Sequence, residues 1–315
     1  MLMAKTAFLF PGQGSQAVGM GQDFYQAYAW AQEIFDLADE ATGKPISKLC
    51  FEGPLEELTR TVNLQPAITA VNLVCFRALS EKGLKPYAVA GHSLGEYSAL
   101  AAAGVLAVEE ALKLVNLRGE LMQRDAERRP GAMQAVVGLS REEVESIVEL
   151  ARDHGVVVVA NHNSPQQLVI TGESEAVAAA AKLVKTKRGR AVPLPVSGAW
   201  HSPLMEQAAA DFASALEKTK FSAPSYPVYL NVTGAAETDP AAIKKAMARQ
   251  IISPVRWCDI VENMAAAGVN AFVEVGPKNV LAGLVKKTLT AESQAEILNV
   301  QDTAGVTQAA ENLGS

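Results

Sequence analysis

The sequence predicts an α/β protein in which a large discontinuous α/β domain is interrupted by a small ferredoxin-like subdomain. A short apolar run leads into Gly91-His92-Ser93-Leu94-Gly95, and a helix-prone stretch follows, as in a strand, a tight turn and a helix. Residues 130–197 then alternate in the order β-α-β-β-α-β, which is typical of ferredoxin-like units. We expect residues 1–129 and 198–315 to form the large domain and residues 130–197 the small one.

The first part of the chain reads as one strand followed mainly by helices. An apolar, β-prone run ends at Pro11-Gly12, and apolar residues at helical spacing come after it. A charged break at residues 127–131, which contains Pro130 and Gly131, marks the domain boundary. The expected strands are residues 6–10 and 87–90, and the expected helices are residues 22–42, 65–82, 96–103 and 108–123.

The second part begins with the small subdomain. Ser140 and Glu143 have the spacing of a capping box, which predicts that a helix begins at residue 141. The expected strands of the subdomain are 132–138, 156–160, 167–171 and 191–196, and its helices are 141–153 and 174–187. After Pro195 the chain returns to helices, and two further strands are expected, one near residues 228–231 and one at residues 271–275. The tail after Asp302 is rich in Ala, Gly and Thr, and we expect it to be loosely ordered.

The composition excludes several classes of protein. The chain has 315 residues, 49% of them hydrophobic and 20% charged, and its net charge of −6 disfavours a nucleic-acid binder. No signal peptide and no apolar run long enough to cross a bilayer is apparent. The three cysteines are far apart and lack metal-ligand spacing, so they fit reduced thiols in a cytoplasmic protein.

The pentapeptide around Ser93 predicts a nucleophile. At a strand-to-helix junction the turn is so tight that a side chain at Gly91 or Gly95 would collide with backbone, while Ser93 is pushed outward. The helix that follows points free amides at the reacting centre. On this basis we expect an α/β-hydrolase-like elbow with Ser93 as nucleophile.

A serine nucleophile needs a base, and the chain has four histidines. The side chain of His92 should point away from the Ser93 hydroxyl, and His154 is at a helix end of the subdomain. His162 is expected in a polar loop and remains an alternative. His201 lies where the chain re-enters the large domain, and we favour it as the base.

Arg118 is unusual because it falls on the apolar stripe of its helix, in line with Leu114 and Met122. A core-facing arginine is costly unless a carboxylate or phosphate meets it. Its planar fork suits bidentate pairing with a carboxylate. Arg118 is therefore a ligand site, part of a structural ion pair, or a side chain that extends along the apolar stripe to the surface.

The N-terminal Gly12-Gln13-Gly14 loop formally matches a dinucleotide fingerprint. We reject that reading because no second strand ending in an acidic residue follows within one βαβ unit. The loop could instead bring an amide at Gln13 close to a developing oxyanion, or be a plain tight turn.

One basic cluster stands out in this acidic chain. It could steer an acidic protein partner, although most such runs are solvated helix ends. The cluster consists of Lys182, Lys185, Lys187, Arg188 and Arg190.

Taken together, these residues resemble the malonyl-CoA:acyl carrier protein transacylase family over nearly the whole chain. The resemblance rests on residues 10–16, 65–67, 91–97, 117–119, 163–165, 198–201, Gln250 and 274–277. It implies transfer of malonyl from malonyl-CoA to acyl carrier protein, with no metal or prosthetic group on this chain, since the phosphopantetheine is carried by the partner protein. The charge and the apolar run lengths predict that neither nucleic acid nor a membrane is a partner. Two positions depart from common members, namely Trp200 in place of Phe or Ser and Gln167 in place of Gly.

The resemblance also assigns roles to individual residues. It implies that Ser93 carries the acyl group, that His201 is the base and that Arg118 binds the malonyl carboxylate. The amides of Gln13 and Leu94 would hold the oxyanion, and a carbonyl in the Gln250 segment would orient His201 as a triad Asp does. The residues implied to border the substrate are His92, Met122 and Trp200.

Two alternatives belong to other functional classes. A serine hydrolase has the chain order Ser…Asp…His available, with Asp125 or Asp153 as the acid. Arg118 would have no role in a general esterase, however. A non-catalytic subunit that docks carrier protein would not need Ser93, His201 and Arg118 together.

Overall fold

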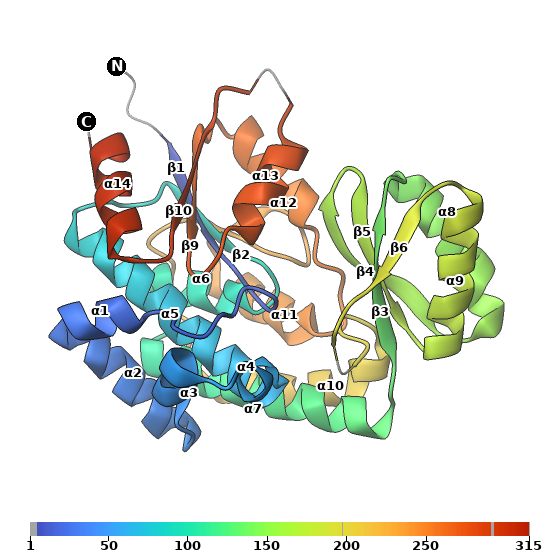
Figure 1. Ribbon diagram of the computed structural model, residues 1–315, viewed down its shortest axis with the longest axis horizontal. Helices are drawn as coiled ribbons and strands as arrows, with labels where there is room; N and C mark the ends of the chain where they lie inside the picture. Colours follow the sequence, from blue (N-terminus) through green and yellow to red (C-terminus); the bar gives the residue numbers. More distant parts are fainter. Residues whose placement is uncertain (1–4, 197, 291–292, 315) are drawn as a thin grey trace.

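Two sheets organise the chain, and in Figure 1 the smaller sheet with its two helices lies beside the larger sheet and the helices around it. The computed structural model describes residues 5–196, 198–290 and 293–314. Residue 197, the predicted last residue of the small subdomain, and the chain ends at 1 and 315 lie outside the described residues. The larger sheet has the strand order β10-β9-β1-β2-β7-β8, and the smaller one β4-β5-β3-β6.

The larger sheet is parallel except for its last pair, β7 with β8. Its strands are β1 (Thr6–Phe10), β2 (Ala88–Gly91), β7 (Val228–Tyr229), β8 (Ala236–Glu237), β9 (Ala271–Val275) and β10 (Glu296–Val300). Strands β1, β2 and β9 are buried along their whole length, as expected for a parallel sheet covered on both faces.

Twelve α-helices of the described residues belong to the part of the chain that contains this sheet. They are α1 (Gln22–Ala27), α2 (Ala29–Thr42), α3 (Ile46–Glu52), α4 (Leu55–Thr59), α5 (Thr61–Glu81), α6 (Gly95–Ala102), α7 (Val108–Arg128), α10 (Glu206–Lys218), α11 (Pro240–Gln250), α12 (Trp257–Ala266), α13 (Val280–Thr288) and α14 (Thr303–Leu313).

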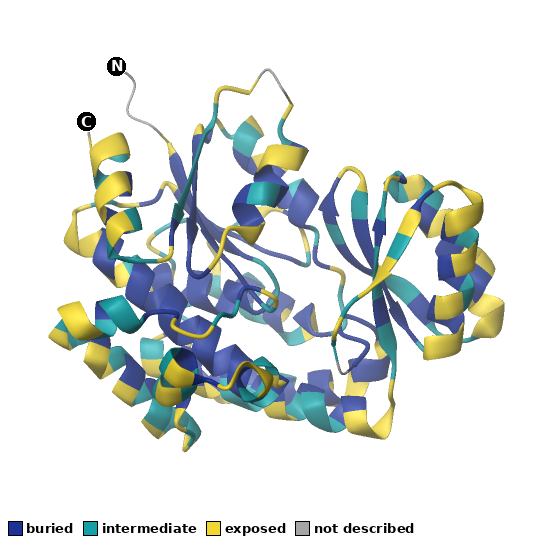
Figure 2. Ribbon diagram, in the orientation of Figure 1, coloured by how far each residue is buried: buried dark blue, intermediate teal, exposed yellow. Residues whose placement is uncertain are grey.

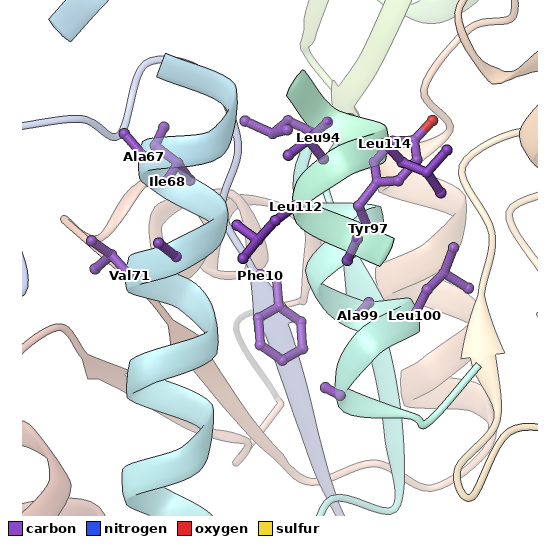
Figure 3. Close-up of a cluster of buried hydrophobic side chains, with 14 of the residues drawn as sticks. Phe10, Ala67, Ile68, Val71, Leu94, Tyr97, Ala99, Leu100, Leu112 and Leu114 are labelled. Carbon is purple, nitrogen blue, oxygen red and sulfur yellow. The ribbon is translucent and has the colours of Figure 1, made fainter. Parts of the chain in front are cut away.

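Alternate side chains of β1 pack into two separate hydrophobic cores, because successive side chains of a strand point to opposite faces of the sheet. Phe8 and Phe10 pack into the core that includes α5, α6 and α7, and Figure 3 shows the Phe10 ring between α5 and α6. Ala7 and Leu9 pack on the other side, against residues of α12 and α13. The strand is thus fixed from both faces, which holds the loop after Phe10 in place.

Helix α5 runs through the middle of the helical layer and is mostly buried (Figure 2). By length and composition alone it is apolar enough to cross a membrane, but 83% of its apolar window is buried inside the protein. That burial is typical of a core helix.

The smaller sheet carries the predicted ferredoxin-like order of elements. These are β3 (Ala132–Val137), α8 (Arg141–Ala151), the 3-10 turn η1 (Arg152–His154), β4 (Val157–Ser164), β5 (Gln167–Gly172), α9 (Ser174–Thr186) and β6 (Arg190–Pro193). The predicted capping box is present, with Ser140 accepting from the Glu143 amide and the Glu143 side chain accepting from the Ser140 amide. Helices α8 and α9 cover one face and form a core of their own with Val136, Leu168 and Ile170.

We call residues 130–196, which carry the smaller sheet, the smaller unit, and the rest of the described chain the larger unit. The face of the smaller sheet that α8 and α9 do not cover is turned toward the larger unit. Met133, Ala135 and Val169 alternate with the core residues of their strands and line a pocket. A parallel bridge between Asn161 and Val255 ties the two units together, because the Val255 amide donates to the carbonyl of Ala160 across 2.8 Å. The pocket therefore lies between the smaller sheet and loops and helices of the part of the chain that contains the larger sheet, and backbone hydrogen bonds at Val255 join these two parts.

Two expectations about helical segments were wrong. Residues 22–42 are not one helix, because Tyr28 is extended (φ −136°, ψ 124°) and its ring stacks on Trp30 at 4.9 Å. The tail is not loosely ordered. Asp302 caps α14 by accepting from the Gly305 amide, and Val306 is buried in the main core.

Several element ends also differ from expectation. Helix α7 continues to Arg128, since Arg124 pairs with Asp211 of α10 and fixes its last turns. Helix α5 begins at Thr61 and includes Pro66 near its start. Strand β4 extends to Ser164, so His162 lies in a strand and not in a loop.

Candidate active site

Ser93 occupies a sharp turn between β2 and α6. Its φ of 49° is in the left-handed region, which is unusual for a residue with a side chain. A Cβ on Gly91 would lie 2.0 Å from the Gly95 carbonyl carbon, and one on Gly95 would lie 2.0 Å from the carbonyl oxygen of Phe10. Only glycine allows the backbone to pass this closely, and the result is a strained serine whose hydroxyl faces the pocket.

His201 is the histidine that meets this serine. Its Nε2 lies 2.7 Å from Ser93 Oγ. Its Nδ1 lies 3.1 Å from the carbonyl oxygen of Gln250 and 2.9 Å from that of Ser253. Carbonyl oxygens only accept, so Nδ1 carries the proton and Nε2 is left to accept from the serine hydroxyl.

The environment keeps His201 neutral. Burial, and second to it the charge of Arg118, lowers the pKa of His201 to about 3. An unprotonated Nε2 is what a general base requires.

The other histidines and the rival acids lie elsewhere. His162 does not line the pocket and has Asp259 at 3.5 Å, while its strand neighbours Asn161 and Asn163 face the pocket. His154 is exposed. Asp125 accepts from the amide of Ala208, and among the described residues no carboxylate contacts His201 Nδ1. The arrangement lacks the acid of a hydrolase triad in the part of the chain that the structure describes.

Arg118 is almost fully buried and its side chain reaches Ser93. Its Nη2 donates to Ser93 Oγ across 3.2 Å and to Gln250 Oε1 across 3.1 Å, and its Nη1 donates to Gln65 Oε1 across 2.9 Å. Burial lowers the pKa of Arg118 from its ordinary value. No carboxylate of the described residues lies within ion-pair distance of it. The structural ion pair that the sequence left open is therefore not what holds this cation.

A pocket of about 260 Å³ opens in front of Ser93. Met122, Trp200 and His92 are part of its wall, and His92 Nε2 lies 2.8 Å from Asn163 Oδ1. Gln13 and Leu94 also line it, and neither backbone amide has a hydrogen-bond partner among residues 5–196, 198–290 and 293–314. Two unpaired amides beside a serine hydroxyl provide donors for an oxyanion.

The basic cluster is exposed, at the end of α9 and the start of β6. None of its five side chains takes part in an ion pair with a described residue. The cluster lies on the smaller unit, at the right of Figure 1.

Sequence reasoning missed the polar residues that hold the site. Gln65 contacts Arg118 and Ser253 contacts His201. Asn231 contacts the Ser93 amide, and Glu96 contacts Gln250. A signal was available for Glu96, an acidic residue in a helix that is otherwise apolar and small. Asn231 gave none beyond its position just after a strand.

A serine hydroxyl shared by an imidazole and a buried guanidinium is suited to moving an acyl group that itself carries a negative charge. Fold and site together are those of an acyltransferase, and a family model described as the acyl transferase domain matches residues 7–310. Comparison with similar proteins then identifies the acyltransferase family. The chain belongs to the malonyl CoA-acyl carrier protein transacylase family.

Three comparisons carry that statement. A malonyl CoA-acyl carrier protein transacylase of Haemophilus influenzae is 44% identical over 305 residues, covering 96% of this chain and 97% of the relative. The crystal structure of an acyl carrier protein S-malonyltransferase from Vibrio cholerae superposes with a TM-score of 0.92 at 44% identity, over 97% of this chain and 100% of the other. The structure of a malonyl-transacylase in complex with a type II PKS acyl-carrier protein has a TM-score of 0.93 at 40% identity, and the match covers 98% of this chain and 100% of the other.

Proposed function

We propose that this enzyme transfers the malonyl group from malonyl-CoA to the phosphopantetheine thiol of acyl carrier protein, through a malonyl ester on Ser93, and so supplies fatty acid synthesis. The observation that carries the proposal is that one hydroxyl, Ser93 Oγ, lies within hydrogen-bond reach of both a neutral imidazole and a buried guanidinium. The imidazole suits proton removal, and the guanidinium suits a substrate carboxylate.

In the first half of the reaction, His201 Nε2 takes the proton of Ser93 Oγ as that oxygen attacks the malonyl thioester carbonyl. The backbone amides of Gln13 and Leu94 donate to the oxyanion that forms. As the carbon–sulfur bond breaks, the imidazolium returns the proton to the CoA sulfur. The malonyl group is then an ester on Ser93.

The second half runs in reverse with a new thiol. His201 takes the proton of the phosphopantetheine thiol, and the sulfur attacks the ester carbonyl. The same amides hold the second oxyanion, and the proton goes to Ser93 Oγ as the ester bond breaks. The carbonyls of Gln250 and Ser253 keep the imidazole oriented throughout, doing the work of a triad Asp. The chemistry is acyl transfer between thiols, and this chain needs no metal or prosthetic group of its own for it, because the phosphopantetheine is carried by the partner protein.

Selectivity follows from Arg118. A carboxylate on the acyl group can pair with its fork, whereas an uncharged acyl group leaves the buried cation without a charged partner. Trp200, Met122 and His92 border the acyl group, and the bulk of Trp200 disfavours an α-methyl branch.

The carrier protein would approach from the smaller unit. Acyl carrier proteins are acidic partners in this proposal, and the exposed cluster at Lys182, Lys185, Lys187, Arg188 and Arg190 offers complementary charge. We place the reaction in the cytoplasm, where the three free, buried cysteines would stay reduced.

The test is a two-step assay. Purified enzyme incubated with malonyl-CoA alone should gain one malonyl group, measured by intact mass and mapped to Ser93, and should pass it to added holo carrier protein. Ser93→Ala should gain none. A mass gain that persists in Ser93→Ala, or release of malonate to water at the same rate with and without carrier protein, would overturn the proposal in favour of a different nucleophile or a hydrolase.

A further inference from the structure

Glu96 is a buried carboxylate that the reaction as described does not use. It lies in the first turn of α6, three residues after the nucleophile, and only 1% of its surface is exposed. Its Oε1 accepts from the Asn231 amide across 2.9 Å, and its Oε2 accepts from Gln250 Nε2 across 2.7 Å. Each carboxylate oxygen thus accepts one hydrogen bond, which reduces the free-energy cost of burying the charge.

Both partners of Glu96 go on to hold the backbone of Ser93. Asn231 Oδ1 accepts from the Ser93 amide across 2.7 Å, and its Nδ2 donates to the Gly91 carbonyl across 2.7 Å. Gln250 Nε2 also donates to the Ser93 carbonyl across 2.8 Å. Ser93, whose φ is 49°, is therefore hydrogen-bonded at its N–H by Asn231 and at its C=O by Gln250, and both of these residues also donate to the Glu96 carboxylate.

Gln250 extends the same network to Arg118. Its Nε2 faces Glu96 and its Oε1 accepts from Arg118 Nη2 across 3.1 Å. An amide thus stands between the buried anion and the buried cation. Direct pairing of Glu96 with Arg118 would neutralise the guanidinium and compete with a substrate carboxylate, and the intervening amide prevents this.

We propose that Glu96 is a positioning residue that, through Asn231 and Gln250, fixes Ser93 and Arg118 in one geometry and keeps Arg118 available to a carboxylate. This inference rests on the proposed malonyl transfer. Small displacements of a nucleophile are costly, since misplacement by about 1 Å lowers rates by about 100-fold.

The first variant is Glu96→Gln, which keeps the shape of the side chain but replaces one carboxylate oxygen by an NH2 group. That group would face the N–H of Asn231 or of Gln250, so one donor would meet another. Assays run at pH 8, because burial raises the pKa of Glu96 to about 7 and the carboxyl is mostly ionised there. We expect kcat for malonyl transfer to fall by about tenfold or more. We also expect the malonyl-to-acetyl ratio of acyl-Ser93 formation to fall, because Arg118 loses its fixed partner.

A purely structural carboxylate would lower the melting temperature and leave the rate per folded molecule and the acyl ratio unchanged. The matched control is Asp125→Asn, another buried carboxylate, which accepts from the Ala208 backbone amide and pairs with Arg124. In the part of the chain that the structure describes, no hydrogen bond or ion pair joins Asp125 to Ser93, His201 or Arg118. We expect it to change stability without changing kcat or the acyl ratio.

The second variant approaches the network from its other end. Gln250→Leu removes the side-chain amide and keeps the main-chain carbonyl that faces His201. We expect it to lower kcat and the acyl ratio as Glu96→Gln does, and the double variant to be no worse than the more damaged single one. This variant also tests the proposal if Glu96→Gln does not fold.

The outcomes separate two failures. If the wild-type enzyme transfers no malonyl group, the proposed function itself fails. If the wild type is active and Glu96→Gln retains wild-type kcat and acyl ratio, or if the effects of the two substitutions on kcat simply multiply, Glu96 does not act through Gln250 and this inference is overturned.

Discussion

The guanidinium of Arg118 and the hydroxyl of Ser93 are joined by a hydrogen bond of 3.2 Å, from Nη2 to Oγ. The cation that would recognise the substrate therefore touches the atom that would attack it. Among the described residues its other hydrogen-bond partners are the neutral amides of Gln65 and Gln250, and it lies 5.6 Å from the centre of the Tyr97 ring. Its charge is therefore solvated by the protein but not cancelled. In the proposed reaction, recognition of the substrate charge and nucleophilic attack would therefore take place at one point of the pocket.

Replacing Arg118 should change which acyl group is loaded. Arg118→Ala should lower malonyl loading relative to acetyl loading by about 30-fold or more, since a hydrogen-bonded charge pair contributes about 2 kcal/mol. Competition between malonyl-CoA and acetyl-CoA, read by the mass of the acyl-enzyme, measures the ratio. Arg118→Lys, which keeps the charge but loses the fork, should fall between the two. An unchanged ratio in Arg118→Ala would remove this residue from the selectivity argument.

The titration of His201 should be absent from the neutral range. With its pKa lowered to about 3 by burial, the ring stays neutral from pH 8 down to pH 5. An unfolded chain would bind a proton at this residue below about pH 6.5, which the folded protein does not, so His201 lowers stability as the pH falls from about 6.5 toward 3. NMR of ring-labelled histidine should show no midpoint for His201 between pH 5 and 8. A midpoint near 6.5 would contradict the buried, neutral base.

The elbow should not tolerate a methyl group. Gly95→Ala would place a Cβ 2.0 Å from the carbonyl oxygen of Phe10, so we expect a loss of about 2–3 kcal/mol of stability and loss of acyl-enzyme formation. Gly283→Ala is the matched control, because nothing lies within 4 Å of its added Cβ in helix α13. That change should stabilise by about 0.5–1 kcal/mol and leave activity intact. Thermal unfolding and the acyl-enzyme assay test both, and equal behaviour of the two variants would refute the steric account.

The basic cluster should matter for only one half of the reaction. Reversing charge with Lys185→Glu and Lys187→Glu should raise the KM for carrier protein by about tenfold and leave the loading of Ser93 from malonyl-CoA unchanged. Added salt should shrink the difference, as expected for exposed charges. Lys48→Glu, an exposed lysine of α3 in the larger unit, is the control and should change neither step. An unaltered KM in the double variant would move the docking surface elsewhere.

The sequence indicated those features that local rules define. A glycine-bounded serine between a strand and a helix, and a serine with a glutamate at capping spacing, each carry their own geometry. The ferredoxin-like order followed from strand and helix patterns in the same way. Where the patterns failed, packing between distant segments decided: α7 gained its last turns from the contact of Arg124 with Asp211, and α14 was fixed by the burial of Val306.

The site divides along the same line. Ser93 was evident from its pentapeptide, and the oddity of Arg118 from its place on an apolar stripe, because both signals are contained in short stretches of chain. Which histidine meets the serine, and which groups hold the guanidinium, depends on residues 108 and 132 positions away, His201 and Gln250, that only the folded chain brings together. Hydrogen bonds reach about 3 Å in space and have no period in sequence. The proposed nucleophile was therefore evident from the sequence alone, which also favoured His201 as its base. The contacts of Ser93 with His201 and with the buried charge of Arg118, and the hydrogen-bond network of Glu96, were decided by the tertiary structure, because they join residues far apart in the chain.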